Sequence, residues 1–163
     1  GFDWRPADAA LYATDNGRDL LGDDFPPCEL NRIEPGRFYG WPFVNGMGVP
    51  DPDFGGQGGE KAAASTPPAH GFGAHTAPLG MRFYRGSAFP ERYRGQAFAA
   101  LHGSWNRTAK SGYKVVLLEW PDDGGGHPPC ERADASRPGC TISSASFAPR
   151  ARRCGVRFST DKE

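Results

Sequence analysis

The sequence predicts an all-β protein, and three observations carry that prediction. Its apolar runs are short and are separated by Gly, Pro and Asp, which is typical of strands joined by turns. The 23 Gly and 16 Pro residues fall between those runs rather than in repeats, so they indicate turns of a folded chain. No helical pattern is long enough to predict a helix, because residues 60–64 are too few and run towards Pro67.

Five strands are expected, with a weaker sixth near the end of the chain. The run from Tyr113 to Trp120 is the clearest, because its β-branched, aromatic and aliphatic residues are nearly continuous between Gly112 and Pro121. A buried helix segment is the alternative for such a run, but its short length favours a strand. In chain order the expected strands are 9–14, 29–33, 79–84, 97–101, 113–120 and, more weakly, 155–159.

Two long segments are expected to be loops. Residues 43–74, a long loop or an insertion, are rich in Gly and Pro, and loops of this length in compact domains are usually functional or disordered. Residues 121–163 contain a run of glycines, paired prolines and a basic stretch. We therefore expect a regular part over 1–120 and a loop-rich continuation of the same fold over 121–163.

The charge balance limits the partners of this chain. It carries 19 basic and 19 acidic residues, so its formal net charge is zero. Nothing in this balance indicates a nucleic-acid or membrane-surface partner. No apolar run approaches the roughly 20 residues that a membrane-spanning helix needs.

The four cysteines allow three disulfide pairings, and the sequence does not choose among them. Cys130 and Cys140 enclose a short Pro- and Gly-containing loop and are favoured as a local pair, which would need an oxidising compartment. His127 beside these cysteines imitates a zinc site, but the spacings fit no common zinc motif. Free buried thiols are the alternative for Cys28 and Cys154.

An acidic, glycine-punctuated segment precedes the strand at 29–33. Its hard oxygen donors are Asp15, Asn16, Asp19, Asp23, Asp24 and Glu29. Gly17 and Gly22 let the backbone bend, so that carbonyl oxygens can also point inward. Oxygen donors of this kind are the ligands that Ca²⁺ prefers, and a solvated acidic turn is the alternative.

Three segments together resemble the soluble pyrroloquinoline-quinone (PQQ) sugar dehydrogenases, the glucose, sorbosone and pyranose dehydrogenase group. They are residues 15–42, which end in Tyr39-Gly-Trp-Pro42, then His75-Thr-Ala-Pro-Leu-Gly-Met-Arg-Phe-Tyr84, then His102-Gly-Ser-Trp-Asn-Arg107. The resemblance covers about residues 1–120 and implies a six-bladed β-propeller. At about 40 to 50 residues per blade, the chain supplies only about two to three blades, so we expect a fragment of a propeller.

The resemblance implies oxidation of a sugar hydroxyl with hydride transfer to PQQ, assisted by Ca²⁺ acting as a Lewis acid. The main-chain carbonyls of Gly17 and Arg18 match the family's Ca²⁺ ligands. The side chains matched to PQQ are those of His102, Asn106, Arg107 and Arg152, and His75 is matched to the sugar. The family's proton-accepting His lies on an earlier blade, so the resemblance implies no catalytic base in this chain.

Each matched side chain has a plainer interpretation. Arg107 suits a planar oxyanion, because a guanidinium donates two parallel hydrogen bonds, but it could instead be a solvated loop residue. His75 and His102 could equally be structural histidines. Arg152 lies in a poorly matched context.

Several neighbouring residues carry further expectations. Many relatives have Asp where this chain has Cys28, a departure that puts any role for that carboxylate in doubt. Glu29 and Asn31 are expected to brace the loop by hydrogen bonds, or to be ordinary polar strand residues. Blade-core packing is expected of the aromatic residues Tyr39, Trp41, Phe83 and Trp105, and Trp41 has the wall of a pocket as its alternative.

Two other functions compete with the enzyme. One is a non-catalytic propeller that binds a carbohydrate or a protein partner, because one fold hosts many functions. The other is a non-functional piece, because an unclosed propeller leaves strand edges unpaired. The resemblance also implies a periplasmic or secreted location, and it leaves the electron acceptor open.

Overall fold

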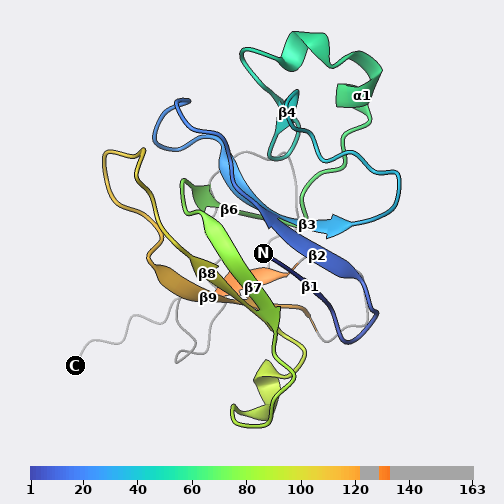
Figure 1. The fold of residues 1–163 in the computed structure, drawn as a ribbon, viewed down its shortest axis with the longest axis vertical. Coiled ribbons are helices and arrows are strands. Elements are labelled where there is room, and N and C mark those ends of the chain that lie inside the picture. Colours follow the sequence, from blue (N-terminus) through green and yellow to red (C-terminus); the bar gives the residue numbers. More distant parts are fainter. Residues whose placement is uncertain (122–128, 133–163) are drawn as a thin grey trace, which may run out of the picture.

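The computed structural model describes residues 1–121 and 129–132, and these form two four-stranded antiparallel sheets (Figure 1). The first sheet has the order β1 (Phe2–Trp4), β2 (Leu11–Asp15), β3 (Pro27–Ile33) and β6 (His70–Ala74). The second has the order β7 (Pro78–Phe83), β8 (Ala97–Leu101), β9 (Lys114–Glu119) and β10 (Cys130–Arg132). The prediction of an all-β chain is confirmed.

A small unit interrupts the first sheet between β3 and β6. It contains the hairpin β4 (Val44–Asn45) and β5 (Val49–Pro50), a 3₁₀ turn at Gly55–Gln57 and the helix α1 (Gly59–Ala63). Figure 1 shows this unit projecting from one end of the molecule. Of the two interpretations of residues 43–74, a long loop or an insertion, the structure shows a structured insertion, and the expectation of no helix is wrong.

The core lies between the two sheets, as alternation along the strands requires. Tyr12 and Leu30 of the first sheet face Met81, Val116 and other apolar residues of the second. Trp120 closes the aromatic part of this core, because its ring lies 5.3 Å from that of Tyr12 and 5.1 Å from that of Phe83. The expectation that Phe83 belongs to the core is confirmed.

One carboxylate fastens the sheets together at the end of β7. Asp3 of β1 is buried and accepts hydrogen bonds from Phe83 N at 2.9 Å and from Arg85 Nη1 at 2.8 Å. The side-chain hydrogen bonds from Arg85 come first among the causes that lower the pKa of Asp3 to about 2. Asp3 therefore stays ionised inside the seam.

The five main predicted strands are confirmed as β2, β3, β7, β8 and β9, with ends that differ by up to two residues. β1 and β6 were missed, because β1 has three residues around a buried Asp and β6 reads His-Gly-Phe-Gly-Ala. Two glycines make β6 a poor strand by sequence, and its pairing with β3 defines it.

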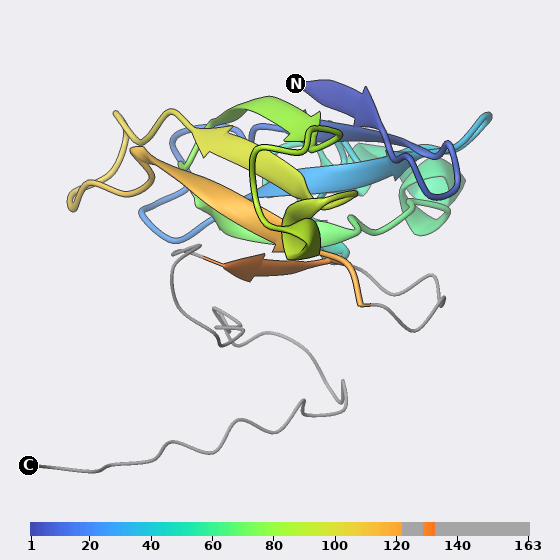
Figure 2. The ribbon, with the colours of Figure 1, turned by 90° about the horizontal axis from the view of Figure 1, so that it is seen from below.

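The end of the chain is described only in part. β10 pairs with β9 and lies at the margin of the molecule opposite β1 (Figure 2). The expected strand 155–159 and Arg152 lie outside the described residues, as do Cys140 and Cys154. The division at residue 120 stays a prediction. No helix in the described part of the chain is long and apolar enough to cross a membrane.

Candidate functional site

Three connections meet at one end of the two sheets. They are the β2–β3 loop at 16–26, the β6–β7 turn at 75–77 and the β8–β9 loop at 102–113. Figure 1 shows the first and third of these loops side by side. Residues far apart in the sequence are thus brought together, which is the usual setting of a binding site.

His75 is built into this end of the fold. Its side chain is only 3% exposed, and its backbone has a φ of 58°, in the left-handed region. Its Nδ1 lies 3.3 Å from Asp19 Oδ1, and its Nε2 lies 2.8 Å from the carbonyl oxygen of Gly22. A carbonyl oxygen only accepts, so Nε2 donates this bond. Both ring nitrogens therefore hold the β2–β3 loop.

Arg107 binds the other half of the same loop. Its Nη1 donates to the carbonyl oxygen of Asp23, and its Nη2 lies 2.8 Å from Asp24 Oδ1. Thr108 N donates to Asp23 Oδ1 at 3.0 Å, and the hydrogen bonds from Thr108 lower the pKa of Asp23. Arg107 Nε and Asn106 Nδ2 are buried donors with no hydrogen-bond partner among the described residues.

A cavity of about 100 Å³ lies between these loops. Gly17 forms part of its wall, and the Trp105 side chain stands at the cavity with the residue 80% exposed. A Cβ at Gly17 would lie 2.8 Å from the carbonyl oxygens of both Pro26 and Pro27. Main-chain oxygens therefore crowd around Gly17. The complete lining is Asn16, Gly17, Asp19, Cys28, His75, Ala77, Gly103 and Trp105.

Four predicted site residues do not line this cavity, namely Arg18, His102, Asn106 and Arg107. His102 is exposed and lines a shallow hollow of about 420 Å³ together with Leu79, Tyr113 and Val115. The Arg18 side chain points instead to the β4–β5 unit. The structure thus brings Gly17 and His75 to the cavity wall. Asn106 and Arg107 belong to the adjoining β8–β9 loop, where Arg107 binds Asp23, and His102 lies outside.

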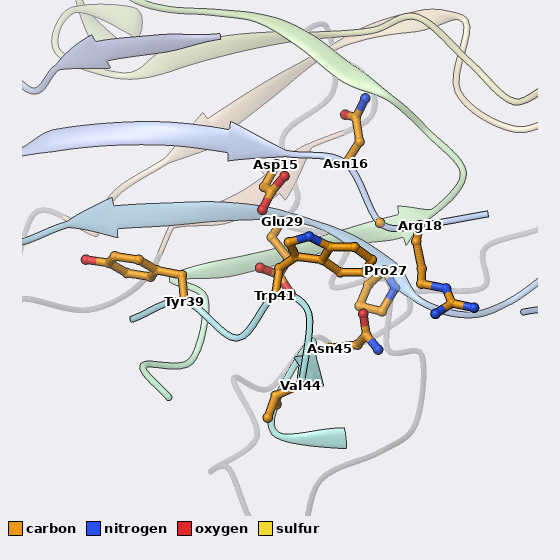
Figure 3. Close-up of a pocket in the computed structure, with 10 residues that line it drawn as sticks. Asp15, Asn16, Arg18, Pro27, Glu29, Tyr39, Trp41, Val44 and Asn45 are labelled. Atoms are coloured by element: carbon orange, nitrogen blue, oxygen red, sulfur yellow. The ribbon is translucent and has the colours of Figure 1, made fainter. Parts of the chain in front are cut away.

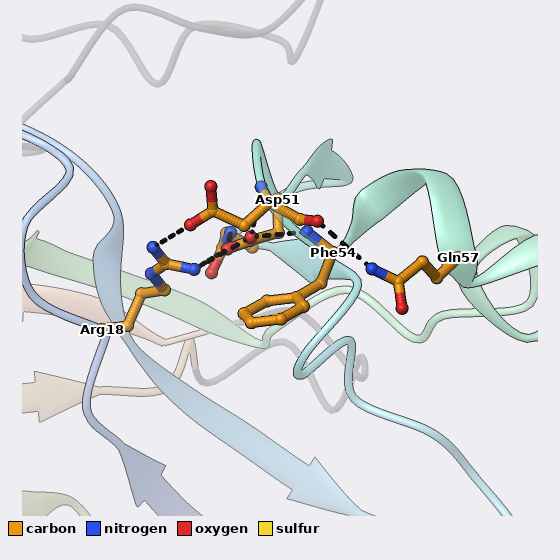
Figure 4. A network of polar contacts seen from close by, with 6 residues as sticks. Arg18, Asp51, Phe54 and Gln57 are labelled. Carbon is orange, nitrogen blue, oxygen red and sulfur yellow. Dashed lines mark hydrogen bonds and ion pairs between the residues drawn. The ribbon is translucent and has the colours of Figure 1, made fainter.

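Arg18 joins the β2–β3 loop to the β4–β5 unit (Figure 4). Its Nη1 donates to Asp51 Oδ1 at 3.0 Å, and its Nη2 donates to Asp53 Oδ2 at 2.6 Å. Burial raises the pKa of Asp51, but hydrogen bonds from Asn45 and from the amides of Asp53 and Phe54, with the charge of Arg18, lower it overall. This buried carboxylate is therefore ionised and fully bonded.

A second cavity, of about 190 Å³, lies on the other side of Asn16 and Gly17. Figure 3 shows side chains from β2, β3 and the segment after β3 around it. Its lining residues are Asp15, Asn16, Gly17, Arg18, Pro27, Glu29, Tyr39, Trp41, Val44 and Asn45. Trp41 is 54% exposed here. The expectation that Trp41 packs in the core is wrong, and its alternative as a pocket wall is confirmed.

Two carboxyl groups stand at this second cavity as direct cross-strand neighbours. Asp15 of β2 is paired with Glu29 of β3 in the ladder. Burial raises the pKa of both, and the nearby charge of Asp15 raises the pKa of Glu29 further. Glu29 accepts from Gly46 N at 2.8 Å and from Asn31 Nδ2 at 3.2 Å. Glu29 thus holds the β4–β5 unit, and Asn31 holds Glu29. The prediction that they brace the acidic loop before β3 is not confirmed.

The carboxylates of the acidic loop do not converge on one point. Asp19 faces His75, Asp23 and Asp24 face the β8–β9 loop, and Asp15 faces the second cavity. In 1–121 and 129–132, no three His, Cys, Asp or Glu side chains are grouped to hold a metal ion. A cation at this end would depend on main-chain oxygens.

Sequence reasoning missed Asp51, and it named Asn16 and Cys28 without placing them at a cavity. Asn16 lines both cavities, Asp51 anchors Arg18, and Cys28 forms part of the smaller one. Cys28 is a free, buried thiol. The paired Pro-Asp dipeptides at 50–53 were a usable signal for Asp51, because Asp in such a turn tends to bind nearby amides.

Comparison with known proteins places the chain among relatives of PQQ-dependent sugar oxidoreductases. The curated relatives include an uncharacterised protein of Borreliella burgdorferi, 42% identical over 123 residues, which are 73% of this chain and 31% of that protein. They also include the PQQ-dependent pyranose dehydrogenase of Coprinopsis cinerea, 48% identical over 44 residues, or 27% of this chain and 5% of that enzyme.

Two solved structures share the fold. One is a calcium structure of the Trichoderma reesei family AA12 enzyme, with a TM-score of 0.60 and 22% identity, covering 88% of this chain and 39% of the other. The second is the holo PQQ domain of the Coprinopsis cinerea pyranose dehydrogenase, with a TM-score of 0.55 and 21% identity, covering 83% and 38%. This chain thus spans well under half of each.

The TrAA12-like family model matches residues 57–154. The chain belongs to the TrAA12-like family. The resemblance stated from residues 15–42, 75–84 and 102–107 is thereby confirmed at the level of the family.

Proposed function

We propose that this chain is part of a PQQ- and Ca²⁺-dependent sugar dehydrogenase. The observation that carries the proposal is the pair of unpartnered buried donors, Asn106 Nδ2 and Arg107 Nε, at the loop end of the sheets. A buried donor without an acceptor costs free energy, and an acidic quinone supplies acceptors. The AA12 and pyranose dehydrogenase relatives support the same class.

The residues present fit the two groups. Crowded main-chain oxygens around Gly17 offer the hard ligands that Ca²⁺ takes, so the carbonyls of Gly17 and Arg18 are the proposed Ca²⁺ ligands. Asn106 and Arg107 would donate to PQQ oxygens. When bound, PQQ accepts the hydride equivalent from the sugar, and the cation polarises the quinone.

The other matched residues take supporting roles in the proposal. His75 fixes the β2–β3 loop at the cavity wall, from which it could also contact the sugar. His102 would need a ligand that reaches the outer face of the second sheet. Arg152 remains a proposed PQQ contact outside the described residues. The proton acceptor is proposed to come from a part of the protein beyond this chain.

We also propose that the two sheets are successive blades of a six-bladed propeller. Each is a four-stranded antiparallel sheet, which is the form of a blade. Phe2 and Trp4 are exposed on the outer face of the first sheet, and Leu79 and Val115 on that of the second. Further blades would cover both apolar faces. Residues 121–163 would continue the propeller, and a periplasmic or secreted location follows from the family alone.

A non-catalytic carbohydrate-binding propeller is the second candidate. Cys28 favours it, because this thiol lines the smaller cavity where many relatives are expected to carry a carboxylate. This reading predicts binding of a carbohydrate that neither PQQ nor Ca²⁺ changes.

The test is calorimetric titration of the whole protein with PQQ, with Ca²⁺ and after EDTA, followed by dye-linked oxidation of a panel of sugars. We expect PQQ binding that needs Ca²⁺ and that weakens about tenfold in Arg107→Ala, the loss of a hydrogen bond to a charged group. Lys110→Ala is the matched control, since Lys110 is an exposed cation of the same loop. Absence of PQQ binding with Ca²⁺ present would overturn the proposal.

A further inference from the structure

The larger cavity, between β2, β3 and the β4–β5 unit, has the size of a single-ring site. Pockets for drug-sized ligands measure roughly 300–1,000 Å³, whereas this cavity measures about 190 Å³. It therefore suits one small ring rather than a chain of rings. Asn16 and Gly17 line both this cavity and the smaller cavity between the loops, so the two cavities share a wall.

One wall of the larger cavity is aromatic and held in place. Trp41 is half-exposed there, and its ring meets that of Phe54 edge to face at 6.3 Å. Phe54 lies in turn beneath the guanidinium of Arg18, at 5.6 Å. Tyr39 is fixed by its hydroxyl, which donates to the Arg32 carbonyl oxygen and accepts from Glu34 N, both at 2.7 Å. Exposed aromatic rings held in place in this way present a flat apolar surface to a ligand.

The facing wall consists of acceptors with spare capacity. Glu29 has its two oxygens occupied by Gly46 N and Asn31 Nδ2. Among the described residues, Asp15, its cross-strand neighbour, has a hydrogen bond only from the adjacent amide of Asn16. A carboxylate can accept about four hydrogen bonds, so Asp15 has room for several donors. The amide side chains of Asn16 and Asn45 also line the cavity.

We propose that this cavity binds one pyranose ring, with a C–H face of the sugar on the Trp41 indole and neighbouring hydroxyl groups donating to Asp15. A ring with an apolar face and hydroxyl groups at its rim matches both walls. The inference rests on the proposed sugar dehydrogenase function and names a sugar subsite beside Gly17 and Arg18, the proposed Ca²⁺ ligands. In this proposal Trp41 and Asp15 bind the sugar and take no part in a chemical step.

The test measures sugar binding directly, in whole protein that has been treated with EDTA and holds no PQQ. D-Glucose, D-galactose and D-mannose are titrated by calorimetry and by saturation-transfer NMR, with glycerol as the acyclic polyol. We expect saturable binding of at least one hexose and none of glycerol. Trp41→Ala should weaken that binding about tenfold and Asp15→Asn about fivefold, in line with loss of an aromatic contact and of a charge-assisted hydrogen bond.

Two further variants keep the result interpretable. Trp41→Phe retains an aromatic surface and should stay within about threefold of the parent protein. Glu91→Gln removes an exposed carboxylate in the distant β7–β8 connection and should leave binding unchanged. Hexose binding that is unaltered by both Trp41→Ala and Asp15→Asn, or no hexose binding at all, overturns the inference.

Because the titration uses no cofactor, its outcome is separate from that of the PQQ experiment. Hexose binding that depends on Trp41 supports the subsite even if the protein never oxidises a sugar. In loaded enzyme, a subsite of this kind predicts that Trp41→Ala raises KM while kcat stays unchanged, as for uniform binding. An unchanged KM with a lowered kcat would contradict it.

Discussion

At one end of the seam between the sheets, Asp3 is held as an ionised carboxylate. At the loop end, by contrast, burial opposes ionisation of the carboxyl groups of Asp15 and Glu29. Asp3 has hydrogen bonds from two amides and from Arg85, and its pKa falls to about 2. Burial raises the pKa of Asp15 and Glu29. Two carboxylates side by side on neighbouring strands also repel each other.

The difference separates residues that hold the fold from residues that are available to a ligand. At its end of the seam, Asp3 has both of its oxygens bonded, by Arg85 and by the amides of Trp4 and Phe83. At the loop end the structure retains an incompletely compensated carboxyl pair and unpartnered donors on Asn106 and Arg107. Perturbed titration and unsatisfied polar atoms are concentrated where ligands bind.

The largest expected effect is that of Asp3→Ala, which removes the bonded carboxylate from the seam. We expect a loss of about 3 kcal/mol in the free energy of unfolding, because breaking a buried pair leaves Arg85 and Phe83 N unsatisfied. Urea unfolding measures it, with Asp8→Ala, a turn carboxylate outside the seam, as the control. Equal effects of the two substitutions would remove Asp3 from its role as the fastener of the sheets.

The same carboxylate gives a signed pH dependence. Its pKa in the folded protein is about 2, below the ordinary Asp value of 3.8, so the stabilisation is complete above pH 4 and is lost as pH falls towards 2. The shift corresponds to about 2 kcal/mol. Asp3→Ala should therefore flatten the fall in unfolding free energy between pH 4 and pH 2.

Gly17→Ala tests the loop end, with a smaller expected cost of about 2 kcal/mol from overpacking. The added Cβ would lie 2.8 Å from two carbonyl oxygens, so the β2–β3 loop has to shift. Gly56→Ala is the matched control, because no atom lies within 4 Å of its added Cβ. Differential scanning calorimetry with and without Ca²⁺ measures thermal stability, and the shift that Ca²⁺ causes reports ion binding. Full Ca²⁺ binding by Gly17→Ala would count against a cation at these carbonyls.

Asp51→Asn tests the link between that loop and the β4–β5 unit. The amide keeps an acceptor for the backbone of Asp53 and Phe54 but loses the charge that faces Arg18. We expect exchange of these two amides to speed up about tenfold, the effect of one charge-assisted hydrogen bond. Hydrogen exchange should leave the amides of β8 unchanged. Equal acceleration in β8 would mean that the whole fold, rather than the unit, has been loosened.

The strands that sequence predicted best are those whose local pattern and tertiary role agree. β9 is nearly continuous in apolar residues and crosses the core. β8 is also apolar throughout, and its buried residues alternate with less buried ones. β6 has two glycines and one large apolar side chain, and only its pairing with β3 makes it a strand. Long-range pairing of this kind leaves little trace in a local pattern.

The candidate site could be predicted by residue type but not by geometry. The sequence identified Gly17, His75 and Arg107, which the fold brings to one end. It could not show that the Arg18 side chain turns away to Asp51, or that His102 lies on an outer face. The register of strand pairing decides which side chains of a strand face the core. Hydrogen bonds to residues far away in the sequence decide the path of a loop. Trp41 was misplaced for the same reason, since aromatic content alone does not distinguish core from cavity wall.

The smallest expected effect is that of Glu29→Gln, which removes one charge from the carboxyl pair. Burial raises the pKa of Glu29, so the folded state loses stability as pH rises through that raised pKa. The amide keeps an acceptor for Gly46 N, and a rotated Asn31 amide could use its unpartnered Oδ1 to accept from the new side chain. We expect an unfolding free energy at pH 7 within about 0.5 kcal/mol of the parent protein and a flatter profile between pH 4 and pH 7. A loss comparable with that of Asp3→Ala would show that Glu29 holds the fold as Asp3 does, and the contrast between the two ends would fail.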